Sequence, residues 1–175
     1  APFLRNRGAQ RLEGILLTDF SKKHAGGLVS VLRDFPVRYL LYPGSFLCVP
    51  DGFSKTLRSL GRRAKAIQQG DEVLMEKEKM RVIAQTQKGT VLLVASGPWR
   101  IFIISRWEAE LFDGLWAHVN SDEVHAIFLP PPAQDIPSGF YNWISLRRPL
   151  LAVFPDADPA FVTHLAAYGV PCLNL

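Results

Sequence analysis

The chain has 175 residues, of which 48% are hydrophobic and 21% are charged, with a net charge of +4. This composition excludes a disordered chain and predicts a single domain over residues 1–175 with a sizeable core. No apolar run reaches the roughly 20 residues that cross a bilayer, because residues 90–104 are interrupted by Gly97 and Pro98. The chain opens with Ala-Pro, and we expect it to be a fragment of a larger protein. Two cysteines, Cys48 and Cys172, are too few for a disulfide framework.

The charges are unevenly distributed along the chain. Residues 1–65 carry 12 lysine and arginine residues against 4 acidic ones, whereas residues 66–175 carry 8 against 12. Such asymmetry is typical of a protein with one side that faces a polyanion. The alternative is that the charges average out on the folded surface and have no partner.

The first third of the chain alternates between strand and helix patterns. Residues 12–18 form a short apolar run of the kind found in buried parallel strands. A helix is predicted from about His24 to Pro36, and residues 37–41 form a second strand, so the segment is a βαβ-like unit. One face of that helix carries Leu28, Val31, Leu32 and Phe35.

A second helix is predicted over residues 54–64, with a basic stripe on one face. The stripe consists of Lys55, Arg58 and Arg62. Four strands then follow in close succession, which predicts an antiparallel meander. They span residues 72–75, 80–86, 90–95 and 99–104.

From Glu108 onward the alternation of helix and strand returns. Helices are expected after Glu108, over residues 138–146 and after Asp158, which is a good N-cap before Pro159. Strands are expected over residues 124–129, 150–154 and 171–173. The pattern favours two sheets with helices outside, and a doubly wound open sheet remains the alternative.

Several segments resemble the metallo-β-lactamase superfamily, and most closely the soluble domain of the ComEC competence family, which forms a DNA-uptake channel. Residues 2–8, 12–19 and 24–28 resemble the leucine-rich strand and the His-x-His-x-Asp-His-x-Gly-Gly motif with its following helix. Further matches are residues 103–110 (the Thr-Gly-Asp segment), 124–132 (the strand that delivers a later His) and 150–173 (the closing strand, helix and strand). The resemblance implies an α/β fold, a metallo-β-lactamase-like αββα sandwich. It also implies that the family's N-terminal strands are missing, so that an open or externally paired edge lies beside residues 12–18.

The metal ligands that the family motif would supply are largely replaced. The first two His positions fall on Asp19 and Ser21, the Asp falls on Lys23, and the last His is His24. The bridging Asp of the second segment falls on Arg106, and the later His falls at Pro131 or Pro132. Because zinc needs three or four protein ligands, we expect no metal cofactor and no catalytic residues. The chain is then a pseudoenzyme, and a hydrolase with an unrecognised site remains an alternative.

The resemblance predicts a non-catalytic domain of a ComEC-type protein that contacts DNA. Phosphate-binding candidates are the cations around the former metal site and the basic stripe. They are Lys22, Lys23, Arg106, Lys55, Arg58 and Arg62. The expected partners are DNA and the membrane-channel portion of the same protein, which makes the domain membrane-associated and extracytoplasmic. Alternatively, the cations only neutralise the pocket around Asp19, and the domain is purely structural or binds another protein.

Overall fold

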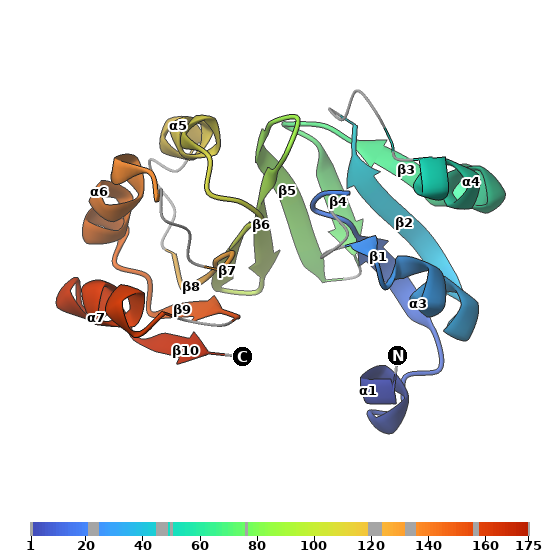
Figure 1. Ribbon diagram of the computed structural model, residues 1–175, viewed down its shortest axis with the longest axis horizontal. Coiled ribbons are helices and arrows are strands. Elements are labelled where there is room, and N and C mark those ends of the chain that lie inside the picture. Colours follow the sequence, from blue (N-terminus) through green and yellow to red (C-terminus); the bar gives the residue numbers. More distant parts are fainter. Residues whose placement is uncertain are drawn as a thin grey trace. The chain divides into compact units, whose positions relative to one another are not determined.

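The computed structural model describes residues 2–20, 25–44, 49, 51–75, 77–118, 124–131, 136–155 and 158–174. The chain divides into two compact units, residues 1–68 and 69–175 (Figure 1). Each unit has its own sheet and its own apolar core, and each is described by itself below. The expectation of a single domain over the whole chain stays a prediction.

The first unit is built on a three-stranded parallel sheet. Its helices are α1 (Pro2–Asn6), α3 (Leu28–Asp34) and α4 (Asp51–Leu60), and its strands are β1 (Leu12–Leu16), β2 (Val37–Pro43) and β3 (Ala64–Ile67). The strand order is β1-β2-β3, with Leu12 opposite Val37 and Leu40 opposite Ala64. The predicted βαβ unit is therefore confirmed, and β1 is an edge strand of this sheet, as expected.

The core of the first unit lies on the face of the sheet that α3 and α4 cover. Leu40 is fully buried, and Leu28 from α3 packs in the same cluster. Phe53 and Leu57 from α4 pack against this cluster, and the Phe20 ring lies 5.6 Å from that of Phe53. Because three elements contribute to one apolar cluster, the helices are held on the sheet mainly by burial of this face.

The second predicted helix ends earlier than its sequence pattern indicated. Helix α4 stops at Leu60, and a 3₁₀ turn over Gly61–Arg63 leads directly into β3. Gly61 has a φ of +54°, a left-handed conformation that ends helices and favours glycine. The prediction that residues 54–64 form one helix was therefore wrong, because Ala64 belongs to a strand and Arg62 lies in the turn.

The second unit is built on a seven-stranded mixed sheet. Its strands are β4 (Glu72–Met75), β5 (Glu78–Gln85), β6 (Thr90–Ser96), β7 (Trp99–Ile104), β8 (Ala126–Phe128), β9 (Leu151–Phe154) and β10 (Cys172–Asn174), in the order β10-β9-β8-β7-β6-β5-β4. Strands β4 to β7 are antiparallel, which confirms the predicted meander, and β7 to β10 are parallel. The turn between β6 and β7 contains Gly97 at a φ of +54°.

Three helices cover one face of the mixed sheet (Figure 1). They are α5 (Ala109–His118), α6 (Ser138–Arg147) and α7 (Pro159–Ala167). The Asp158 carboxylate accepts a hydrogen bond of 3.0 Å from the backbone N–H of Ala160, so the predicted N-cap and Pro159 start are confirmed. The core between sheet and helices contains the fully buried Phe102 and Trp143, whose rings meet edge to face.

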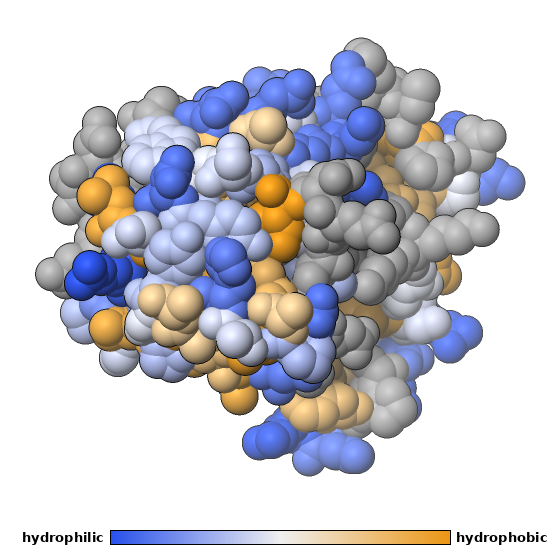
Figure 2. Space-filling view, turned by 60° about the vertical axis from the view of Figure 1, so that its left-hand side comes forward, coloured by the Kyte–Doolittle hydropathy of each residue, from blue (hydrophilic) through white to orange (hydrophobic). Residues whose placement is uncertain are grey.

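The outer surface of the second unit is mixed in polarity. Leu146, Leu150 and Leu173 are its exposed large apolar residues near the C-terminus. Figure 2 shows orange apolar surface broken into several patches among blue and pale residues. Within the described part of the chain, no helix combines the length and the apolar character needed to cross a membrane.

Candidate functional site

The segment after β7 corresponds to the predicted Thr-Gly-Asp-like segment. Its first residue, Ser105, is buried, and its hydroxyl accepts a hydrogen bond of 2.8 Å from the backbone N–H of Thr90. The N–H of Ser105 donates in return to the Thr90 carbonyl at 3.1 Å. Ser105 therefore extends the pairing of β6 with β7 by one residue, which is a structural role.

Trp107 joins the segment after β7 to the segment after β8. Its indole N–H donates a hydrogen bond of 2.8 Å to the backbone carbonyl of Pro131. The Trp107 ring stacks on Phe112 at 6.0 Å and meets Phe140 edge to face at 4.9 Å and Phe161 at 5.8 Å. At this end of two neighbouring parallel strands, the structure thus has an aromatic cluster with one polar contact at its centre.

Three charged residues lie close to Trp107 in the sequence. Arg106 is half-buried and takes part in contacts of its own. Glu108 accepts a hydrogen bond of 2.6 Å from the Thr86 hydroxyl, which ties the start of α5 to the end of β5. Glu110 is exposed on the first turn of α5. No arrangement for paired acid–base chemistry is formed by these two glutamates, since one is engaged and the other faces outward.

The residues of the family's first motif belong to the first unit. Asp19 follows β1, is 1% exposed, and is engaged in a contact. Ser21, Lys22, Lys23 and His24 lie outside the described residues. Their predicted places around a former metal site therefore stay predictions, as does any contact of Asp19 with them.

The donor set of the described residues does not fit the metal centre that the fold family implies. Of the predicted ligand positions that the structure describes, Asp19 keeps a carboxylate, whereas Arg106 is a guanidinium and Pro131 offers no side-chain donor. The Pro131 carbonyl already accepts from Trp107, and Pro132 lies outside the described residues. Among the described residues, no group of three or more His, Cys, Asp or Glu side chains is placed to hold a metal ion. A zinc site needs at least three such ligands.

The charge asymmetry of the sequence coincides with the division into units. The 12 basic and 4 acidic residues of positions 1–65 all belong to the first unit, and the acidic excess belongs to the second. Lys55 and Arg58 are exposed on α4, where the Arg58 guanidinium donates back to the Ser54 carbonyl at 3.2 Å. Arg62 is exposed in the turn after α4, so the helix carries only two of the three residues of the predicted stripe.

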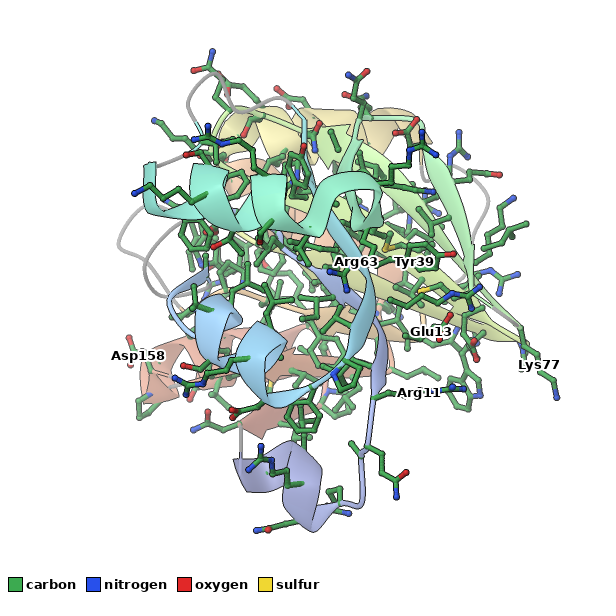
Figure 3. All side chains as sticks on the ribbon, turned by 90° about the vertical axis from the view of Figure 1, so that its right-hand side faces the viewer. Arg11, Glu13, Tyr39, Arg63, Lys77 and Asp158 are labelled. Atoms are coloured by element: carbon green, nitrogen blue, oxygen red, sulfur yellow. The ribbon has the colours of Figure 1, made fainter. Side chains whose placement is uncertain are left out.

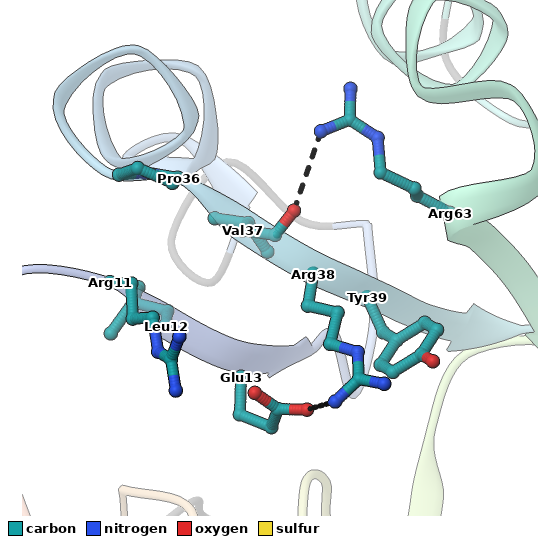
Figure 4. Close-up of a pocket in the computed structure, with 8 residues that line it drawn as sticks. All are labelled: Arg11, Leu12, Glu13, Pro36, Val37, Arg38, Tyr39 and Arg63. Atoms are coloured by element: carbon teal, nitrogen blue, oxygen red, sulfur yellow. Dashed lines mark hydrogen bonds and ion pairs between the residues drawn. The ribbon is translucent and has the colours of Figure 1, made fainter.

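A pocket of about 590 Å³ in the first unit was not predicted from the sequence. It lies where β1 and β2 begin, as Figures 3 and 4 show. We call it the arginine pocket; its lining residues are Arg11, Leu12, Glu13, Pro36, Val37, Arg38, Tyr39 and Arg63. The parallel register of the two strands, with Leu12 opposite Val37, brings together arginines that lie more than 20 positions apart in the sequence.

The described residues that line the arginine pocket include three arginines and one carboxylate, Glu13. Arg38 forms an ion pair with Glu13, and this hydrogen-bonded partner raises the pKa of Arg38 above its usual value. Arg63 donates to the backbone carbonyl of Val37 at 3.4 Å (Figure 4). The pairing of β2 with β3 starts only at Leu40, so the Val37 carbonyl has no partner in β3. The Arg63 guanidinium donates to this carbonyl in place of a strand N–H.

Comparison with known proteins identifies the fold. No family model and no curated protein sequence matches the chain. Among solved structures, the diiron β-hydroxylase CmlA from Streptomyces venezuelae superposes with a TM-score of 0.68 at 12% identity, over 95% of this chain and 44% of that protein. The metallo-β-lactamase fold protein YhfI from Bacillus subtilis has a TM-score of 0.60 at 10% identity, over 98% and 78% of the two chains.

Zinc-bound PqqB from Methylobacterium extorquens gives a similar result, with a TM-score of 0.61 at 11% identity over 93% of this chain and 71% of that one. The chain thus spans less than half the length of the hydroxylase and about three quarters of the other two. At these identities the likeness concerns the fold alone. The chain has the α/β metallo-β-lactamase fold, which confirms the fold class expected from the sequence.

Proposed function

We propose that this chain, with its metallo-β-lactamase fold, is a non-catalytic domain that binds DNA through its basic first unit. In this proposal it is the soluble domain of a ComEC-type DNA-uptake protein and adjoins the membrane-channel portion of that protein. The sequence resemblance supports the ComEC assignment, and the chemistry of the described residues supports the loss of catalysis.

The observation that carries the non-catalytic role is the hydrogen bond from Trp107 to Pro131. It occupies the carboxyl ends of β7 and β8, where the family motif would deliver a bridging Asp and a later His. Rings of Phe112, Phe140 and Phe161 surround the indole. An apolar cluster of this kind stabilises the fold by burial and offers no ligand for a cation.

The support for DNA binding is the concentration of positive charge in one unit. Lysine and arginine side chains neutralise backbone phosphates and release condensed counterions, so DNA affinity falls with salt in proportion to the number of contacts. Lys55 and Arg58 are exposed on α4, and Arg62 is exposed in the turn that follows. The acidic residues of the first unit are Glu13, Asp19, Asp34 and Asp51, of which only Asp51 belongs to α4, as its first residue.

Fluorescence anisotropy with labelled DNA at a series of salt concentrations tests the proposal. Lys55→Ala with Arg62→Ala should weaken binding and lower the slope of log affinity against log salt by about 1.5, for two phosphate contacts. Lys22→Ala with Lys23→Ala tests the former metal site in the same way. The matched control is Lys77→Ala with Lys88→Ala, which removes two exposed charges from the second unit.

Three outcomes decide the matter. A parent protein that does not bind DNA at low salt contradicts the proposed DNA contact. Equal losses in the control and the stripe variants contradict a specific role for the first unit. Cleavage of single- or double-stranded DNA by the parent protein, with or without manganese, contradicts the non-catalytic role.

The edge position of β1 favours a second candidate, a protein-interaction domain. Among the described strands, β1 pairs only with β2, and Glu13 and Gly14 on it are exposed. An unpaired strand edge is a template for strand addition by another chain. If this edge pairs with a second copy, light scattering should report a dimer that forms with rising protein concentration; a monomer at all concentrations contradicts that pairing.

A further inference from the structure

We infer that the arginine pocket is a binding site for phosphate groups, separate from the former metal site. The pocket is lined by the first residues of β1 and β2, whereas Asp19 follows the last residue of β1. Since β1 and β2 are parallel, their first residues lie at one end of the strands and their last residues lie at the other end. The arginine pocket and Asp19 therefore lie at opposite ends of the strands of this sheet.

The guanidinium groups of Arg11 and Arg63 have N–H donors that no described residue uses. Among the described residues, no hydrogen bond or ion pair engages the Arg11 side chain, and Arg11 lines the pocket just before β1 (Figure 4). Arg63 uses one N–H for the Val37 carbonyl, at the long distance of 3.4 Å. Each guanidinium carries five N–H donors in a fixed fork that matches phosphate oxygens. Arg11 and Arg63 thus supply the free donors that an oxyanion needs.

The contacts of Tyr39 favour a phosphate group over a nucleobase as the ligand of the pocket. Its ring centre lies 5.1 Å from the Arg38 guanidinium carbon and 5.3 Å from the Lys65 amino nitrogen. These cation–π contacts hold both cations beside the pocket and use the ring as their support. Because the ring is already engaged by cations, it is not offered as a stacking platform for a nucleobase. Binding should therefore depend on charge and salt, and not on base sequence.

Neutralising Glu13 should change phosphate binding in the opposite direction from removing an arginine. Within the described part of the chain, Glu13 is the only carboxylate that lines the pocket, and it holds Arg38 in an ion pair. A phosphate entering the pocket meets repulsion from this carboxylate and competes with it for Arg38. Neutralising Glu13 should therefore strengthen phosphate binding, whereas removing an arginine should weaken it.

The volume of about 590 Å³ falls in the range of small-ligand pockets, which is roughly 300 to 1,000 Å³, so it accepts a phosphate together with the group that carries it. The shared chemistry is a phosphate ester, whether on a nucleic-acid strand or on a small phosphorylated compound. Only the nucleic-acid source rests on the function proposed above.

Titration followed by NMR of the arginine side-chain N–H signals tests the inference in the full chain. The probes are inorganic phosphate, a nucleoside monophosphate and a short oligothymidylate at low salt. Arg11→Ala should weaken binding of each bound probe roughly tenfold, as for one lost charge-assisted contact, and Glu13→Gln should strengthen it several-fold. Arg63→Lys keeps the charge but loses the fork and should weaken binding less than Arg11→Ala. Lys88→Ala, an exposed cation in the second unit, should bind like the parent.

The outcomes separate this inference from the proposed function. Arg11→Ala is the decisive variant, because that side chain has no described partner and its loss should leave the melting temperature unchanged. If Arg11→Ala and Glu13→Gln bind phosphate as the parent does, the inference is overturned. If inorganic phosphate and the monophosphate bind at the arginines but the oligothymidylate does not, the pocket stands as a site for small phosphorylated ligands and DNA binding falls. If the oligothymidylate binds and only the Lys55 and Arg62 variants weaken it, DNA binding stands and the pocket inference falls.

Discussion

The indole of Trp107 and the carbonyl of Pro131 form a 2.8 Å hydrogen bond that links the segments following two adjacent parallel strands. Trp107→Ala should lower the free energy of unfolding by about 3–5 kcal/mol, because it removes a large ring from an aromatic cluster and leaves the carbonyl without its donor. Trp107→Phe keeps most of the ring and should cost less, about 1–3 kcal/mol, chiefly through the lost hydrogen bond.

Denaturant unfolding followed by circular dichroism measures both variants. Trp99→Phe provides the matched control, because Trp99 is 55% exposed and its replacement should change the free energy of unfolding by about 0.5 kcal/mol or less. A Trp107→Phe variant as stable as the parent would show that the Pro131 carbonyl is equally well solvated without the indole.

Gly89 sits where the turn between β5 and β6 approaches α5 closely. A Cβ atom there would lie 2.8 Å from Leu111 Cδ1 and 3.1 Å from Ser105 Oγ, and both residues are buried. Gly89→Ala should therefore destabilise the protein by about 1–3 kcal/mol through overpacking. Gly139→Ala in α6 has ordinary room, with 3.6 Å to Trp116 Nε1, and should stabilise by up to about 1 kcal/mol. Thermal unfolding of the two variants gives shifts of opposite sign; shifts of the same sign contradict the close approach.

The residues at the ligand positions of the family motif predict how much metal the purified protein contains. Because Ser21, Lys23, Arg106 and Pro131 replace metal ligands, the purified protein should contain no stoichiometric zinc, manganese or iron. Elemental analysis after expression in medium supplemented with all three metals measures this. About one metal per chain, lost in a His24→Ala variant, would mean that His24 and other residues of the chain still build a metal centre.

Cys172 should react slowly with alkylating reagents in the folded protein. Burial raises the pKa of its thiol, and the thiol also donates to the Val170 carbonyl at 3.5 Å. Since the thiolate is the nucleophile, a raised pKa moves the onset of alkylation to higher pH than in the unfolded chain. Peptide mapping by mass spectrometry follows Cys172 separately from Cys48. Identical pH profiles for folded and unfolded protein would contradict the raised pKa.

Local sequence signals were enough to predict the elements whose contacts lie close together in the sequence. The meander followed from alternating strands and from Lys88-Gly89 and Gly97-Pro98 at its turns, and α7 followed from Asp158 and Pro159. The helix predicted over residues 54–64 failed at Gly61, whose left-handed φ ends α4 and lets β3 begin. The prediction rested on the periodicity of apolar and basic residues and did not use the glycine as a stop signal.

The candidate sites depend on contacts between distant residues, and the sequence alone predicted them poorly. Arg11 and Arg63 line one pocket only because β1 pairs in parallel with β2 and because β3 begins too late to cover Val37. Trp107 meets Phe140 and Phe161 only because α5, α6 and α7 cover one face of the sheet. Neither arrangement leaves a pattern in any single segment, since the partners come from different elements.

The change from antiparallel to parallel pairing at β7 has a consequence for how the second unit folds. Ser96 and Trp99 pair across a turn, whereas Ile101 pairs with Ala126 and Ala126 pairs with Leu151, each across 25 positions. Closing a short loop costs less chain entropy than closing a long one, so hairpins can form before crossover pairs. We therefore expect the meander to assemble first and β7 to act as the template on which β8, β9 and β10 add in order. The slow step of folding then belongs to the C-terminal half of the sheet, where hydrogen-exchange protection should appear last.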